Sequence, residues 1–346
     1  MPLNSDTTRR GALCAVVTTI QSPTDAVRQL IARLRPLDAR LVIVGDKKGP
    51  AAYDVEGVQF LSLQGQLELG FDLAHSLPTG HYARKNIGYL VAIQDGATCI
   101  YETDDDNAPL ESWTMRQETV HVRAVPQDGW VNVFRWFSSE TIWPRGFPLD
   151  EVRESLRFAP EFSEELIRVS APIQQGLANN SPDVDAIWRL ILDEPFEFES
   201  GPSLCLRPAA WCPFNSQSTW WFPVAYPLMY LPSYCSFRMT DIWRSFIAQR
   251  CLWEMGLGIV FHGAEVRQER NEHDLMRDFQ DEVPGYVRNK EMAATLESLE
   301  LSRGSDVVGA NLLSCYRKLI TEGFFPEKEF ELVNAWLIDI ERARAY

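Results

Sequence analysis

A continuous apolar and β-branched run, Ala12–Ile20, constrains the fold more than any other segment of the chain. An apolar run without polar alternation is typical of a strand that is buried on both faces of a parallel sheet. Similar runs recur downstream, separated by segments with helical spacing. This alternation predicts an α/β protein with a doubly wound, mostly parallel sheet, in which ligands bind beyond the carboxyl ends of the strands. The strands are expected over Ala12–Ile20, Leu41–Val44, Val58–Leu63 and Ala97–Glu102, and the helices after Ser22 and over Ala83–Asp95.

The chain beyond residue 130 is less regular, because proline and aromatic residues interrupt the apolar pattern. We expect a strand over Trp130–Phe137, packed irregular loops over Gly201–Tyr234 and a helix over residues 240–255. A further strand, Gly258–Phe261, is expected to end at His262. The last part of the chain has the apolar spacing of helices.

The 346 residues carry 33 basic and 48 acidic side chains, which gives a formal net charge of −15. This balance lacks the basic footprint of a nucleic-acid-binding protein, so we expect no nucleic-acid partner. No apolar run approaches the roughly 18 residues needed to span a bilayer, and the first residues lack the pattern of a secretory signal. Seven cysteines without paired spacing indicate reduced thiols. We therefore expect a soluble, cytoplasmic protein with no transmembrane segment.

Three consecutive aspartates, Asp104–Asp106, follow directly after the fourth expected strand. One interpretation is a solvated acidic turn. The position at the end of a buried strand favours a divalent-cation site instead, because Asp104 and Asp106 can turn toward one point and Mg²⁺ prefers oxygen ligands. Three adjacent negative charges also repel one another unless a cation is bound. The sequence has neither of the glycine-rich phosphate loops of dinucleotide oxidoreductases and P-loop kinases.

Several sequence blocks within residues 12–260 resemble the STELLO family (the DUF288 group) of GT-A-type glycosyltransferases. These blocks are Ala83–Ala97, Ile100–Asn107, Trp143–Leu149, Ile173–Leu177, Pro182–Ile187, Pro213–Gln217 and Thr240–Arg244. The resemblance implies a GT-A fold, a nucleotide-sugar donor and an aspartate-rich motif for Mn²⁺ or Mg²⁺. We expect a GT-A-like domain over residues 1–285, with a nucleotide-binding half at about 10–130 and an acceptor half at about 131–285. A helical C-terminal extension is expected over residues 286–346.

The resemblance also implies roles for individual side chains. Asp104 and Asp106 would ligate the metal, and His262 could complete the metal shell, although a lone histidine is more often structural. Contacts with the donor are expected from Thr18, Thr19, Asp46, Lys48, Arg84, Lys85, Asn86, Asp105 and Arg145. Several of these side chains have a structural alternative: the threonines and Asp46 could shape turns, and Arg145 could lock its own loop. Cations in the first turn of a helix, such as Arg84 and Lys85, are normally disfavoured there, which favours a role in binding the donor diphosphate.

An inverting transfer needs a carboxylate base to deprotonate the acceptor hydroxyl. Asp241, at the start of the helix over residues 240–255, is the preferred candidate. Asp183 and Asp185 form a second acidic pair that could contact the acceptor or supply the base. All three have a structural alternative, because acidic residues commonly cap or begin helices.

The sequence thus predicts a metal-dependent glycosyltransferase that moves a sugar from a UDP- or GDP-sugar to a glycan or other hydroxyl acceptor. Two alternatives stay open. The acidic motif also resembles that of reversibly glycosylated polypeptides, so the protein could be a nucleotide-sugar mutase. It could also be a non-catalytic scaffold that organises other enzymes of glycan synthesis.

Overall fold

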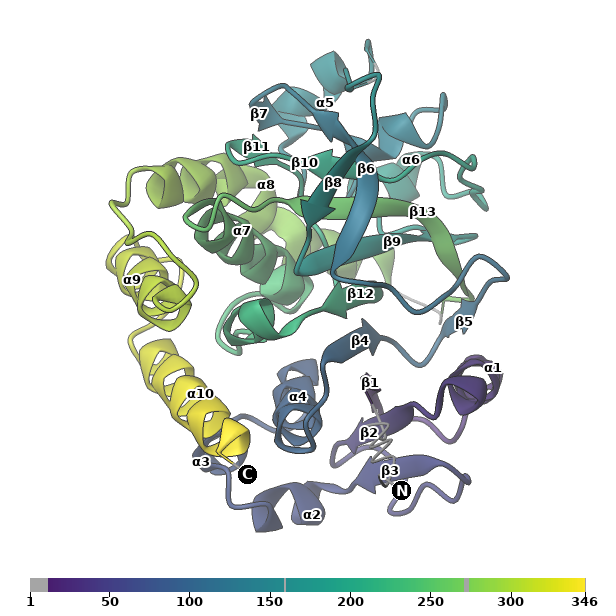
Figure 1. The fold of residues 1–346 in the computed structure, drawn as a ribbon, viewed down its shortest axis with the longest axis vertical. Helices are drawn as coiled ribbons and strands as arrows, with labels where there is room; N and C mark the ends of the chain where they lie inside the picture. The colour runs from purple at the N-terminus through teal and green to yellow at the C-terminus, as the bar shows by residue number, and fades with distance from the viewer. Residues whose placement is uncertain (1–11, 159, 271–273, 346) are drawn as a thin grey trace, which may run out of the picture.

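The computed structural model describes residues 12–158, 160–270 and 274–345 (Figure 1). The ends of the two predicted domains at residues 1–11 and 346 lie outside the described residues. Within the described part, eleven strands form one sheet in the order β3-β2-β1-β4-β12-β9-β13-β10-β6-β8, with β5 paired to β13. Helices cover this sheet, which confirms an α/β fold of the GT-A kind with C-terminal helices.

The first part of the chain contains β1 (Leu13–Thr19), α1 (Asp25–Leu34), β2 (Arg40–Gly45), β3 (Val58–Leu61), α2 (Leu63–Glu68), α3 (Asp72–Ser76), α4 (Lys85–Gln94), β4 (Cys99–Thr103), β5 (Asn107–Pro109), β6 (Thr119–Val125) and β7 (Gly129–Trp130). The middle part contains α5 (Leu149–Ser155), β8 (Ile167–Ser170), β9 (Ile173–Asn179), α6 (Ala186–Ile191), β10 (Leu204–Leu206), β11 (Ala210–Trp211) and β12 (Ser218–Trp221). The last part contains α7 (Thr240–Trp253), β13 (Ile259–Gln268), α8 (Leu275–Glu297), α9 (Val308–Thr321) and α10 (Lys328–Arg344).

Strands β3, β2, β1 and β4 are parallel neighbours, as the apolar runs predict. Alternate β1 side chains enter two different cores: Val16 packs on the side of α4, and Val17 packs on the side of α1. Helix α4 approaches the sheet closely at Gly88, where an added Cβ would lie 2.5 Å from a methyl group of Val16. Because the strands run in parallel, the carboxyl ends of β1, β2 and β4 meet at one edge of the sheet.

The rest of the sheet mixes both directions, because β12 runs antiparallel to β4 and β9, whereas β9 and β13 are parallel. The expected strand Trp130–Phe137 is wrong: strand β7 ends at Trp130, and Val133–Trp136 forms a 3-10 helix. Periodicity cannot separate these structures when an apolar run is buried on all sides. Strand β13 does not end at His262 but continues to Gln268, with register irregularities just after the histidine.

The C-terminal helices return to the first half of the chain. Figure 1 shows α10, in yellow, lying beside α3 and α4, and Asp339 accepts hydrogen bonds from the backbone N–H groups of Asp72 and Leu73. Helix α8 runs unbroken across residue 285, where the sequence places a domain boundary, and the domain division itself stays a prediction. Among the described residues, no helix is both long and apolar enough to cross a membrane.

Candidate active site

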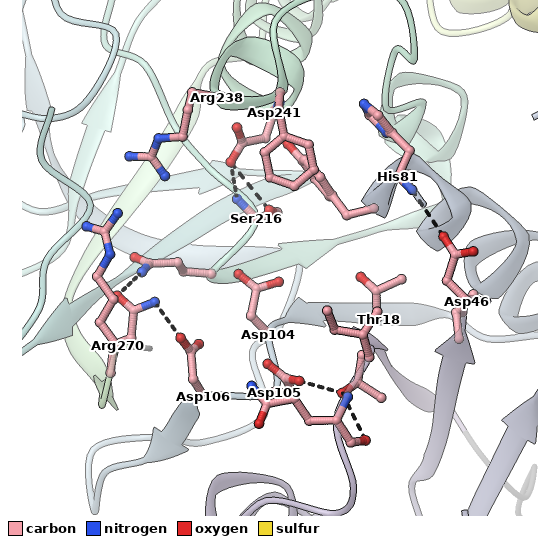
Figure 2. Close-up of a pocket in the computed structure, with 18 of the residues that line it drawn as sticks. Thr18, Asp46, His81, Asp104, Asp105, Asp106, Ser216, Arg238, Asp241 and Arg270 are labelled. Atoms are coloured by element: carbon pink, nitrogen blue, oxygen red, sulfur yellow. Dashed lines mark hydrogen bonds between the residues drawn. The ribbon is translucent and has the colours of Figure 1, made fainter. Parts of the chain in front are cut away.

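A cavity of about 540 Å³ opens at the carboxyl ends of β1, β2 and β4, and residues from both halves of the chain line it. Most of the predicted site residues meet here: Thr18, Thr19, Asp46, Lys48, Asp104, Asp105, Asp106, Arg145, Asp183 and Asp241. Figure 2 shows the aspartates near the middle of this group, with Asp46 on one side and Arg270 on the other. The parallel topology explains this convergence for the first half, because each strand delivers its last side chains to the same edge.

The three aspartates form the turn between β4 and β5, and each is held by a different partner. Lys85 Nζ donates to Asp104 Oδ1 over 2.7 Å, and the Thr19 hydroxyl donates to Asp105. Gln268 Nε2 donates to Asp106 Oδ2 over 3.0 Å. In Figure 2 the carboxylates of Asp104 and Asp106 point into the cavity, whereas Asp105 turns toward the end of β1. The alternation expected from the sequence is therefore present in the geometry.

Burial and mutual repulsion disfavour the charged form of the aspartates in this turn. Burial raises the pKa of Asp106 to about 7, and the neighbouring charges of Asp104 and Asp105 act in the same direction. Burial also raises the pKa of Asp104, although the Lys85 ammonium opposes this shift. Asp106 Oδ1 is buried and has no hydrogen-bond partner within the part of the chain that the structure describes. An oxygen atom of this kind is suited to act as a ligand of a cation.

The cavity does not supply a complete metal shell from the protein alone. The described residues include no group of three or more His, Cys, Asp or Glu side chains arranged to hold a metal ion. Mg²⁺ usually binds through one or two carboxylates, with waters and substrate phosphates completing the shell. The donor chemistry of Asp104 and Asp106 therefore fits a divalent cation that is held jointly with a phosphate-bearing ligand.

Arg145 organises the opposite wall of the cavity. Its Nε donates to Asp183 Oδ1 over 2.8 Å, and its terminal nitrogens donate to the two Asp241 oxygens over 3.0 and 2.9 Å. The loop that carries Arg145 turns at Gly146 (φ +86°), where an added Cβ would lie 2.4 Å from Ile242. Burial would raise the pKa of Asp241, but the Arg145 guanidinium lowers it to about 2. Asp241 is therefore a bonded carboxylate with little affinity for a proton.

Asp46 ties the end of β2 to the loop before α4. Its carboxylate accepts hydrogen bonds from the backbone N–H groups of Gly80 (2.6 Å) and His81 (3.1 Å). Figure 2 shows Asp46 and His81 together on the side of the cavity where Thr18 lies. His81 Nδ1 accepts from the Ala83 N–H over 3.1 Å, so the neutral ring carries its proton on Nε2. Burial lowers the pKa of His81 and thus favours this neutral form.

Three residues predicted to bind the donor lie in the core instead. The buried Arg84 guanidinium donates to Gln66 Oε1 and to the carbonyls of Ala74 and Leu77. The buried Asn86 amide bonds the backbone of Leu231, and Lys85 lies beneath Asp104. These side chains begin α4 on its buried face, so they stabilise the fold and the aspartate turn rather than line the cavity. The unusual placement of cations in a first helical turn thus has a structural reason.

Asp185 and His262 also lie away from the cavity lining. Asp185 caps α6 by accepting from the Trp188 N–H over 2.8 Å, which is the structural alternative for this residue. Both ring nitrogens of His262 are hydrogen-bonded, Nε2 with Gln174 and Nδ1 with Ser203. His262 is consequently not positioned as a metal ligand, because β13 continues past it and carries Gln268 to the aspartates instead.

Several residues of the cavity wall were not expected from the sequence. Arg189, Arg238 and Arg270 line it, as do Ser216 and Gln217. The three arginines come from α6, from the turn before α7 and from the end of β13. Only the tertiary fold brings these separated positions together, so no local spacing in the sequence could have indicated them.

The chain matches known glycosyltransferase sequences. A family model for STELLO glycosyltransferases matches residues 238–345. The probable glycosyltransferase STELLO2 of Arabidopsis thaliana is 28% identical over 346 residues, which covers 94% of this chain and 44% of that protein. The probable glycosyltransferase STELLO1 of the same plant is 29% identical with the same coverage, so this chain spans less than half the length of either relative. These matches show that the chain is similar to the STELLO glycosyltransferases, over residues 238–345 for the family model and over most of its length for the two plant proteins.

Proposed function

We propose that this protein transfers a sugar from a nucleotide-sugar donor to a hydroxyl acceptor, and that the cavity at the carboxyl ends of β1, β2 and β4 is its active site. One observation carries the proposal: Asp104 and Asp106 line a cavity whose walls come from both halves of the chain, and one oxygen of Asp106 is buried without a hydrogen-bond partner among the described residues. The similarity of the chain to STELLO glycosyltransferases supports the same activity. The parallel half of the sheet supports donor binding at this edge, because ligands of such sheets lie beyond the strand ends.

In the proposed complex the nucleoside lies near Thr18 and Asp46, and the diphosphate lies near the aspartate turn. Asp104 and Asp106 would hold Mn²⁺ or Mg²⁺, which supplies charge neutralisation for the departing nucleoside diphosphate when it is bound. The protein's own contribution is to fix the carboxylates in advance: Lys85 orients Asp104, and Gln268 orients Asp106. Such preorganisation removes the cost of arranging charged groups during the reaction.

Asp241 has a positioning role in this proposal rather than the role of a base. A general base works best when its pKa lies near the working pH, and the pKa of Asp241 is about 2. Its two oxygens and Asp183 instead hold the buried Arg145 guanidinium at the cavity wall. Arg145 and the two aspartates thus form a buried ion-pair network that fixes the shape of this wall.

The test is a direct assay of donor turnover. The protein is incubated with UDP- and GDP-sugars, with Mn²⁺ or with EDTA, and released nucleoside diphosphate is measured. We expect release from at least one donor with Mn²⁺, and a loss of at least tenfold in Asp106→Asn. The exposed Asp150→Asn is the matched control and is expected to keep the wild-type rate.

Two other outcomes would contradict the proposal. Interconversion of sugar ring forms without diphosphate release would identify a mutase. Full activity of the Asp106→Asn variant would separate the reaction from this cavity.

A further inference from the structure

Three arginines gather on the wall of the cavity that the second half of the chain forms. Arg189 belongs to α6, Arg238 to the turn before α7, and Arg270 follows the last residue of β13. In Figure 2 the guanidinium groups of Arg238 and Arg270 point toward one another. Guanidinium groups this close repel one another, so their convergence on one cavity needs a physical reason.

The protein itself uses only part of the hydrogen-bonding capacity of these arginines. Arg270 donates through Nη2 to Asp278 over 2.8 Å, and Arg189 donates through Nη2 to the Pro182 carbonyl over 2.6 Å. Arg189 Nε is buried and has no hydrogen-bond partner within the described residues. The guanidinium fork carries five donors, so Arg189 and Arg270 each have N–H groups beyond these bonds, and both side chains line the cavity.

The positive charges of the three arginines act on one another. Burial lowers the pKa of Arg270 to about 9, and the nearby charges of Arg189 and Arg238 add to this shift. Glu282 pairs with Arg238, and Asp183 is already engaged by Arg145. An anionic group at this wall would relieve the repulsion and accept the remaining N–H donors.

The cluster lies apart from the side of the cavity assigned to the nucleoside. Figure 2 shows Arg238 and Arg270 on one side of the aspartates, and Asp46, His81 and Thr18 on the other. A donor whose diphosphate sits at the aspartates would extend from the nucleoside side to the middle of the cavity. The arginine wall then faces the space that is left for the acceptor.

We propose that Arg189, Arg238 and Arg270 form an anion-binding subsite for the acceptor, so that the acceptor of this enzyme carries a phosphate or a carboxylate group. The inference rests on the proposed function, because it takes the aspartate turn as the site of the donor diphosphate. Planar guanidinium forks recognise both phosphate and carboxylate through paired hydrogen bonds. The arginines therefore indicate that the acceptor group is anionic, and the experiment below distinguishes phosphate from carboxylate.

The experiment measures two ligands on the same folded protein by calorimetry. Inorganic phosphate and UDP are titrated separately with Mg²⁺ present, and phosphate is then titrated into protein saturated with UDP. We expect phosphate to bind equally well with and without UDP. Arg270→Gln and Arg238→Gln should each weaken phosphate at least tenfold while changing the UDP affinity less than twofold.

Matched variants and ligands complete the design. Arg267→Gln removes an exposed arginine three positions before Arg270 and should leave both affinities unchanged. If Arg270→Gln folds poorly, Arg270→Lys is used in its place. This variant keeps the positive charge and should retain part of the phosphate affinity. Glucose 1-phosphate and glucuronic acid, compared in the same titration, show whether the subsite selects phosphate or carboxylate.

The two proposals fail in different ways. Displacement of phosphate by UDP, or an equal loss of UDP and phosphate affinity in the arginine variants, would assign the cluster to the donor and overturn this inference alone. Phosphate binding that is absent or insensitive to the arginines would also overturn it. A wild-type protein that binds phosphate but no nucleotide would instead contradict the proposed function.

Discussion

The buried Lys85 ammonium donates a 2.7 Å hydrogen bond to Asp104 Oδ1 and a second 2.7 Å bond to the Thr103 carbonyl. One side chain from the start of α4 thus fixes both the last residue of β4 and the first aspartate of the turn. This link joins the core of the first half to the candidate active site. It also predicts that changes at Lys85 affect stability and ligand binding together.

Lys85→Met should lower the free energy of unfolding by about 2–4 kcal/mol, because it leaves a buried carbonyl and a carboxylate without their donor. Urea unfolding at pH 7 measures this loss. Lys290→Met removes an exposed, ion-paired lysine of α8 and should cost less than about 1 kcal/mol. Equal losses of unfolding free energy in the two variants would show that the buried Lys85 contacts stabilise the fold no more than an exposed ion pair does.

Arg84→Gln should destabilise the protein without weakening nucleotide binding. The Arg84 guanidinium bonds two backbone carbonyls and Gln66 in the core, so its loss should lower the free energy of unfolding by about 2–4 kcal/mol. The dissociation constant for UDP with Mg²⁺, measured on the folded variant, should change less than twofold. A tenfold loss of UDP affinity with normal stability would restore the role that the sequence predicts.

Asp241→Asn should remove a contribution to stability that depends on pH. The folded pKa of about 2 lies below the ordinary value of 3.8, so the charged carboxylate stabilises the fold above about pH 4 and this contribution is lost as the pH falls toward 2. Its size is about 2 kcal/mol. Urea unfolding between pH 7 and pH 3 should show the wild-type advantage shrinking as the pH falls. An advantage that is constant with pH would contradict the assignment.

Asp106→Asn should have the opposite effect on the protein without bound metal. Because the folded pKa of about 7 lies above 3.8, ionisation of Asp106 costs stability as the pH rises through 7. The variant should therefore be more stable than the wild type at pH 8, by about 4 kcal/mol, and equal to it near pH 4. Thermal unfolding in EDTA at the two pH values measures the difference. Lower stability of the variant at pH 8 would show that the aspartate turn is not strained by its charge.

The sequence predicts the first half of the fold well, because its strands are buried on both faces and read as unbroken apolar runs. The same logic locates Thr18, which lies near the end of β1, and Asp46 and the aspartate turn, which directly follow β2 and β4. The end of a strand is harder to predict. His262 was expected at a strand end, but β13 continues to Gln268.

The remaining errors arise where tertiary packing decides the role of a side chain. Polar residues at the start of a helix can face solvent or core, and Arg84 faces the core. The arginine cluster comes from three elements that are far apart in the chain, so its existence depends on the mixed half of the sheet and the helices packed on it. Local sequence patterns therefore cannot predict this cluster.

The proposed role of the aspartate turn is tested most directly by the binding of nucleoside diphosphate. UDP and GDP are titrated into the wild-type protein and into the Asp104→Asn/Asp106→Asn double variant, in Mn²⁺ and in EDTA. We expect at least one nucleotide to bind in Mn²⁺, and we expect EDTA or the double substitution to weaken this binding at least tenfold. Nucleotide binding of equal strength under all four conditions, or none under any of them, would contradict the proposed role.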